Sequence, residues 1–124
     1  MADELTLSVS LTYTPTVANQ VKVAPPTFSA LVDTGSDHAQ GTQVLSTSAE
    51  DFAGAAADIG TGGYVLVKNL STTIDVLMGG STDFLVKLQP GEFALFRTNL
   101  TGTSFKIKSV SGTPTVQYWY FESA

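Results

Sequence analysis

The segment YVLVKNLSTTIDVLMGG, residues 64–80, contains two short apolar runs joined by a polar turn and closed by a pair of glycines. The runs, at residues 64–69 and 73–78, have the length and the composition of β-strands. The same unit repeats along the chain, with turn residues between the runs. The further strand-like runs lie at residues 84–88, 92–97, 104–109 and 115–121.

These runs begin every 8 to 12 residues, and that spacing is typical of β-sandwiches and barrels. No helical segment intervenes to make the crossovers of a parallel sheet. Pro90-Gly91 fits a type II turn, because proline fixes the first central residue and glycine accepts the positive φ of the second. The second half of the chain therefore predicts antiparallel strands.

The segment LTLSVSLTYT, residues 5–14, alternates apolar and hydroxyl-bearing side chains throughout. Side chains point to opposite faces along a strand, so the pattern predicts one half-buried strand with a hydroxyl-rich outer face. The apolar face consists of Leu5, Leu7, Val9, Leu11 and Tyr13.

The region between these two parts is less regular. Short strands are predicted at residues 20–24, 27–33 and 42–46, while residues 47–60 favour a short helix or a compact loop. The whole chain, residues 1–124, is predicted to be one all-β domain. Its expected architecture is an antiparallel β-sandwich of about eight to ten strands, jelly-roll-like by strand count.

Composition excludes several classes of function. Of the 124 residues, 43% are hydrophobic and 14% are charged, below the roughly 25% charged that is usual in soluble domains. Residues 1–60 hold seven carboxylates and one lysine, a net charge of −6, whereas residues 61–124 carry +1. This balance offers no cationic cluster for nucleic acid. There is no cysteine for a disulfide or a thiolate metal site.

The sequence shows no signal for export or for membrane insertion. Its first four residues, MADE, lack the basic and apolar pattern of a signal peptide. No apolar run approaches the roughly 18 residues that a membrane span needs. We therefore expect a protein made in a cytoplasm, with no membrane partner.

The last strand-like run, VQYWYF at residues 116–121, carries large side chains on both faces. Tyr118 and Tyr120 share one face, and Trp119 and Phe121 share the other. A strand that is apolar on both faces needs cover on both. The cover is either a second layer of the same chain or a partner chain, since tyrosine and tryptophan are enriched at interfaces.

The segment ALVDTGS, residues 30–36, resembles the active-site stretch of aspartic proteases, in which two carboxylates share a proton. With one motif, the chain would act as a retropepsin-like homodimer using Asp33, with Val76 to Gly79 as its later apolar-Gly segment. The interval from Asp33 to Gly79 is short for a flap, and no helix follows Gly79. Asp-Thr-Gly is also ordinary turn chemistry at a strand end.

Other catalytic and metal-binding patterns are weak. Asp33, Asp37 and His38 lack the spacing of a calcium loop, and one histidine cannot make a zinc site. With a single histidine and no cysteine, nucleophilic triads have little to work with. The sequence thus predicts a non-enzymatic protein with no cofactor and no metal.

The stretch from about residue 41 to the C-terminus resembles small virion structural proteins of tailed bacteriophages. The resemblance lies in GTGGY at residues 60–64, VLVKNLS at 65–71, LQPGE at 88–92, FALFR at 93–97 and a closing strand at 116–122. It covers about two-thirds of the chain and leaves out residues 1–40. It implies a β-sandwich on the particle, as a capsid decoration or cement protein, or else as a tail or neck component.

The resemblance implies the major capsid protein or other virion proteins as partners, a homo-oligomer such as a trimer, and the virion as the location. A modest contact repeated on many capsid subunits gives high avidity. Residues 1–14 are expected to form an N-terminal contact strand, because unpaired strand edges recruit other strands. A carbohydrate-binding sandwich using Tyr118 and Trp119 is a third class of function. The predicted interface residues are Leu5, Leu7, Val9, Leu11, Tyr13, Tyr118, Trp119, Tyr120 and Phe121.

Overall fold

The computed structural model describes residues 4–16, 19–24, 28–31, 38–52, 63–80, 82–97 and 105–122. These residues form strands and contain no helix. Where residues 47–60 favoured a helix or a loop, the structure has the short strand β6 (Glu50–Asp51), and residues 53–60 lie outside the description. The prediction of an all-β chain is confirmed.

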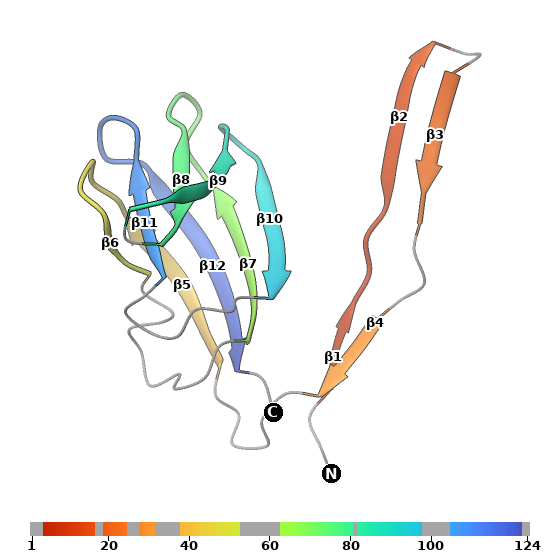
Figure 1. Ribbon diagram of the computed structural model, residues 1–124, viewed down its shortest axis with the longest axis horizontal. Coiled ribbons are helices and arrows are strands. Elements are labelled where there is room, and N and C mark those ends of the chain that lie inside the picture. Colours follow the sequence, from red (N-terminus) through yellow and green to blue (C-terminus); the bar gives the residue numbers. More distant parts are fainter. Residues whose placement is uncertain are drawn as a thin grey trace.

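Two four-stranded antiparallel sheets are built from the strands that follow residue 37 (Figure 1). The first sheet has the order β10-β7-β12-β5 and the second has the order β6-β11-β8-β9. The strands other than β6 are β5 (His38–Val44), β7 (Gly63–Asn69), β8 (Val76–Gly79), β9 (Phe84–Leu88), β10 (Phe93–Arg97), β11 (Lys106–Ser109) and β12 (Thr115–Glu122).

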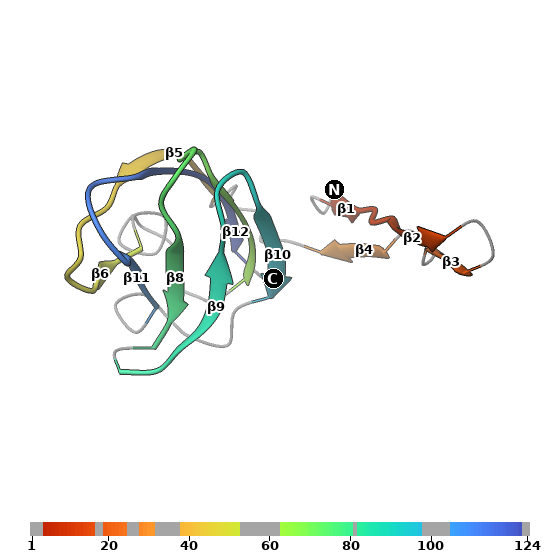
Figure 2. The ribbon, with the colours of Figure 1, turned by 90° about the horizontal axis from the view of Figure 1, so that it is seen from above.

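The pairing of these eight strands is nested. β5 pairs with β12, β6 with β11, β7 with β10 and β8 with β9, each pair antiparallel. The chain is therefore one long hairpin that is rolled so that β12 also pairs with β7 and β11 with β8. This is the topology of a jelly roll, and it confirms the predicted antiparallel sandwich. Figure 2 shows the two sheets facing each other.

Inward-pointing side chains of both sheets form the core. Phe52 is fully buried, and its ring meets those of Phe105 and Tyr118 edge-on at centroid distances of 5.2 and 5.1 Å. Edge-to-face pairs of this kind each contribute about 0.5–1.5 kcal/mol beyond their burial. The buried cluster consists of Leu45, Phe52, Val65, Val67, Val76, Met78, Leu88, Phe105, Ile107, Val116 and Tyr120.

The N-terminal strands lie outside the two sheets of the sandwich, although one sandwich was predicted over residues 1–124. They are β1 (Glu4–Leu7), β2 (Leu11–Thr16), β3 (Asn19–Val23) and β4 (Phe28–Leu31). β1 pairs with β4 and β2 with β3, both antiparallel, and these four strands are here called the arm.

The single strand predicted over residues 5–14 is wrong in one respect: residues 8–10 leave the ladder and separate β1 from β2. On the other side of the arm, β3 ends at Val23 and β4 begins at Phe28. Alternation of side chains does not reveal such a break, because it carries no information on how the strands pair.

Asn69, at the end of β7, connects the two sheets through a set of hydrogen bonds. Its side chain is fully buried and donates to the carbonyl oxygens of Ile74 (2.8 Å) and Leu88 (3.1 Å). Its Oδ1 accepts from the N–H of Ser71 at 3.0 Å. Leu88 ends β9 in the opposite sheet. Both donors and the acceptor of this buried amide are therefore satisfied, as a buried amide requires.

The turn between β9 and β10 docks on the same residue. The N–H of Gly91 donates to the carbonyl of Asn69 at 3.0 Å, and the N–H of Asn69 donates to the carbonyl of Glu92 at 2.9 Å. Glu92 closes the turn, because its N–H donates to the Gln89 carbonyl and its carboxylate accepts from the Gln89 N–H. Gly91 has a φ of 81°, which suits the predicted type II turn.

We expect Asn69→Ala to lower the free energy of unfolding by about 2–4 kcal/mol, because it leaves two buried carbonyls and one N–H without their partner. Urea denaturation measures this change. Thr72→Ala, at an exposed position of the same loop, is the matched control and should change stability by less than about 0.5 kcal/mol. A loss below about 1 kcal/mol in Asn69→Ala would contradict the role given to this residue.

Candidate interaction surface

The outer face of the first sheet has a large apolar area on β12, β7 and β10. Successive residues of a strand point to opposite faces, and the odd-numbered residues of β12 point away from the core that Val116 and Tyr120 join. The register aligns Trp119 with Leu66 on β7, and Leu66 with Leu95 on β10. The next row toward the end of the sheet aligns Phe121 with Tyr64 and Tyr64 with Arg97. We call these two rows, together with Phe93 and Lys68, the open face.

The described charged side chains on the open face are all positive. Lys68 and Arg97 are exposed, and among the outward side chains that the structure describes on this sheet there is no carboxylate. The Arg97 guanidinium lies 5.6 Å from the centroid of the Tyr64 ring, a cation–π geometry. Phe93 is 67% exposed, which is unusual for a phenylalanine beside other apolar groups.

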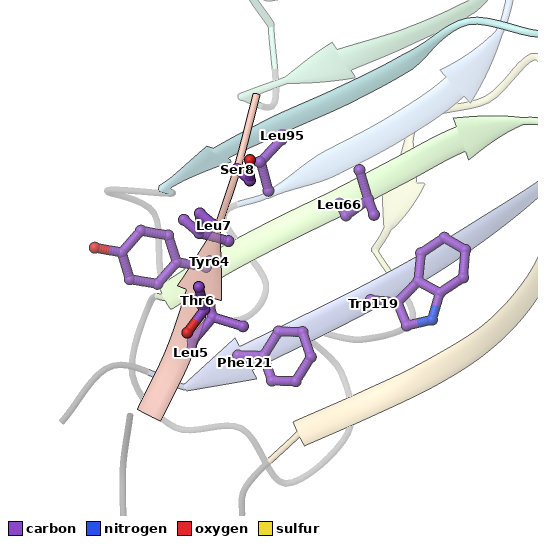
Figure 3. Close-up of a pocket in the computed structure, with 9 residues that line it drawn as sticks. All are labelled: Leu5, Thr6, Leu7, Ser8, Tyr64, Leu66, Leu95, Trp119 and Phe121. Atoms are coloured by element: carbon purple, nitrogen blue, oxygen red, sulfur yellow. The ribbon is translucent and has the colours of Figure 1, made fainter. Parts of the chain in front are cut away.

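β1 crosses one end of the open face and encloses a pocket of about 340 Å³ with it (Figure 3). The arm contributes residues 5–8 to the wall, and the sheet contributes the two aligned rows. Tyr64 is only 8% exposed in this position. The lining residues are Leu5, Thr6, Leu7, Ser8, Tyr64, Leu66, Leu95, Trp119 and Phe121.

The open face continues beyond β1. A second hollow of about 240 Å³ is lined by Leu66, Lys68, Phe93 and Trp119, with no residue of the arm. The apolar surface is thus covered at the end near Tyr64 and uncovered at the end near Phe93.

The outer half of the arm, β2 and β3, extends away from the jelly roll (Figures 1 and 2). These two strands pack mainly against each other. Val9 and Leu11 are 54% and 55% exposed. A two-stranded hairpin is at best marginally stable in water, so the arm needs a further surface to pack on.

The predicted interface residues whose side chains are described fall into three groups: those that line the pocket, those that are exposed and those that belong to the core. Leu5 and Leu7 are half-buried beside the pocket, and Trp119 and Phe121 line it from the sheet. Val9 and Leu11 are exposed. The arm and the last strand, far apart in the sequence, are therefore brought together at one end of the open face. The side chain of Tyr13 lies outside the described part of the structure.

Tyr118 and Tyr120 belong to the core, contrary to the prediction that they lie at an interface. Tyr120 is 1% exposed, and the ring of Tyr118 packs against Phe52 in the core. The sandwich interior, and not a partner chain, covers this face of β12. A glycan-binding role for Tyr118 loses its physical basis for the same reason.

Sequence reasoning missed six members of the open face, namely Tyr64, Leu66, Lys68, Phe93, Leu95 and Arg97. The signal was present, because YVLV at residues 64–67 and FALF at residues 93–96 are apolar on both faces, like the last strand. Three neighbouring strands that share this property predict a sheet with two apolar faces.

The residues considered for catalysis or metal binding lie mostly outside the described part of the structure. Asp33, Thr34, Gly35 and Asp37 lie outside the described residues, as does the side chain of His38. Val76 and Met78, expected behind a protease catalytic loop, are instead core residues of β8. Within the described ranges, no three His, Cys, Asp or Glu side chains gather where they could hold a metal ion.

The described residues contain no helix of the length and apolarity that crossing a membrane requires. No family model, no curated protein and no solved structure with which the chain was compared matches it.

We expect removal of residues 1–31 to leave a folded jelly roll, because all eight strands of the sandwich come after residue 37. Far-ultraviolet circular dichroism should stay β-rich, and unfolding in urea should stay cooperative. Loss of β1 should shift the emission of Trp119, the single tryptophan, to longer wavelength. A truncated chain without a cooperative transition would show that the arm is part of the folding unit.

Proposed function

We propose that the protein is a non-enzymatic structural component of a tailed-phage particle. Its proposed role is that of a capsid decoration or cement protein, which stabilises the shell by binding repeating capsid subunits. The partner in this role is the major capsid protein. A tail or neck position on the same kind of particle is the alternative, and it would use the same surface.

The observation that carries the proposal is the open face next to a projecting arm. Phe93, at 67% exposure, lies in a hollow with Leu66 and Trp119. Contiguous exposed apolar surface of this kind marks a contact with another macromolecule. Aromatic residues beside an arginine, here Tyr64 and Arg97, are typical of protein interfaces.

The fold supports the proposal by analogy. Jelly rolls occur in viral capsid proteins, and also in lectins and cupins. A fold of this breadth does not identify a function by itself. In this chain the roll keeps its interior for a packed core, so binding must take place on its surface.

The low charge of the chain supports the same conclusion. Only 14% of the residues are charged, and the described ion pairs, Lys87 with Asp75 and Lys106 with Asp51, both involve the second sheet. A protein that binds a particle through many equal contacts needs only a weak affinity at each contact, because multivalency raises the overall affinity.

We expect the full-length protein to co-sediment with capsids of its phage and Phe93→Ser to reduce that binding at least about tenfold, because an apolar anchor at an interface contributes more than 1 kcal/mol. Quantitative gel analysis of the sedimented particles measures this. Leu85→Ser is the matched control, since Leu85 is 87% exposed on the second sheet. Equal binding of Phe93→Ser and the wild type would contradict the role of the open face.

Asp33→Asn separates this proposal from the protease alternative. A virion protein should bind particles equally well with and without Asp33, and neither form should cleave peptides. A pepstatin-sensitive peptidase activity that disappears in Asp33→Asn would overturn the proposal in favour of the protease.

A further inference from the structure

Two uncovered apolar surfaces belong to the same chain. One is the outer half of the arm, where Val9 and Leu11 are more than half exposed. The other is the part of the open face beyond β1, formed by Leu66, Phe93 and Trp119. Neither is a surface that a monomer in water would favour.

The arm of a chain does not reach the uncovered part of its own open face. β1 crosses the end near Tyr64, and from there the hairpin runs away from the jelly roll (Figure 2). Residues 8–16 add about 30 Å at the rise of an extended strand. That reach matches the width of a small domain, so the arm can lie across a neighbouring molecule.

The contact within one molecule shows which kinds of side chain would meet between two copies. In one molecule, Leu5 and Leu7 of the arm already stand beside Phe121 and Tyr64 of the open face. Val9 and Leu11 continue the same apolar alternation along the arm. The next rows of the open face offer further large apolar groups, so a second copy extends a contact that the fold already makes.

The contact that β1 already makes favours a second copy of this chain as the occupant. Residues 8–24 contain no carboxylate and one lysine, Lys22, so the outer half of the arm offers mainly apolar and hydroxyl-bearing side chains. The contact between copies is therefore expected to be apolar, as it is where Leu5 and Leu7 line the pocket with the open face.

We propose that the protein self-associates by arm exchange, in which Val9 and Leu11 of one copy cover Leu66, Phe93 and Trp119 on the open face of another copy. Each copy then gives one arm and receives one, so the assembly closes as a dimer or a small ring. This inference deepens the oligomer that the proposed function expects. It requires no capsid, so it can fail while the virion role holds.

The first test measures the mass of the purified full-length chain by light scattering after size exclusion, over a range of concentrations. We expect a closed oligomer whose dissociation constant rises at least about tenfold in Leu11→Ser and in Phe93→Ser. Leu85→Ser should change it less than twofold. A monomer at all concentrations, or an oligomer that both variants leave unchanged, would overturn arm exchange.

The second test shows which surfaces meet. The chain has no cysteine, so Leu11→Cys and heavy-isotope-labelled Phe93→Cys are mixed and linked with a short bis-maleimide. We expect a link from position 11 of a light chain to position 93 of a heavy chain. An arm that folds back on its own molecule cannot give this product. Leu85→Cys in place of Phe93→Cys is the control, and equal linking to both positions would overturn the proposal.

Discussion

The satisfied amide of Asn69 fixes the geometry on which the remainder of the molecule depends. It joins the end of β7 in one sheet to Leu88 in the other, and to the loop that begins β8. By holding the end of β7, it also fixes the register of that strand. A slip of one residue would turn Val65 and Val67 outward and bring Tyr64 and Leu66 into the core. The open face therefore exists because this register is fixed.

The two sheets use their outer surfaces differently. On the second sheet, Lys87 pairs with Asp75, and Leu85 is an isolated exposed residue. Exposed ion pairs and single apolar residues are normal on a surface and contribute little. On the first sheet, apolar side chains form continuous rows. A jelly roll with a complete core gains nothing from these rows as a monomer, and for this reason we propose a partner for them.

Much of the fold followed from local pattern. The strands after residue 63, and the turn at Pro90-Gly91, appear near the predicted places, although β8 begins at Val76 and not at residue 73. Two motifs named from the sequence, the Asn-Leu-Ser at residue 69 and the turn before Phe93, contact each other in the structure. That contact could not be predicted, because it depends on the order of strands in two sheets, which local pattern does not encode.

The candidate interaction surface was harder to predict from the sequence than the fold. The last strand showed two aromatic faces, yet alternation alone does not say which face turns inward, and the core took Tyr118 and Tyr120. The membership of Leu66 and Leu95 in the same surface is a matter of pairing between distant strands.

The central claim is that the protein acts through the open face and the arm. Hydroxyl-radical footprinting of side chains, in the free protein at a dilution where it is a monomer and on the particle, tests it most directly. The account predicts that Phe93, Trp119 and Leu11 lose reactivity on the particle while Leu85 keeps it. Protection of Leu85, with Phe93 and Trp119 as reactive as in the free protein, would contradict it.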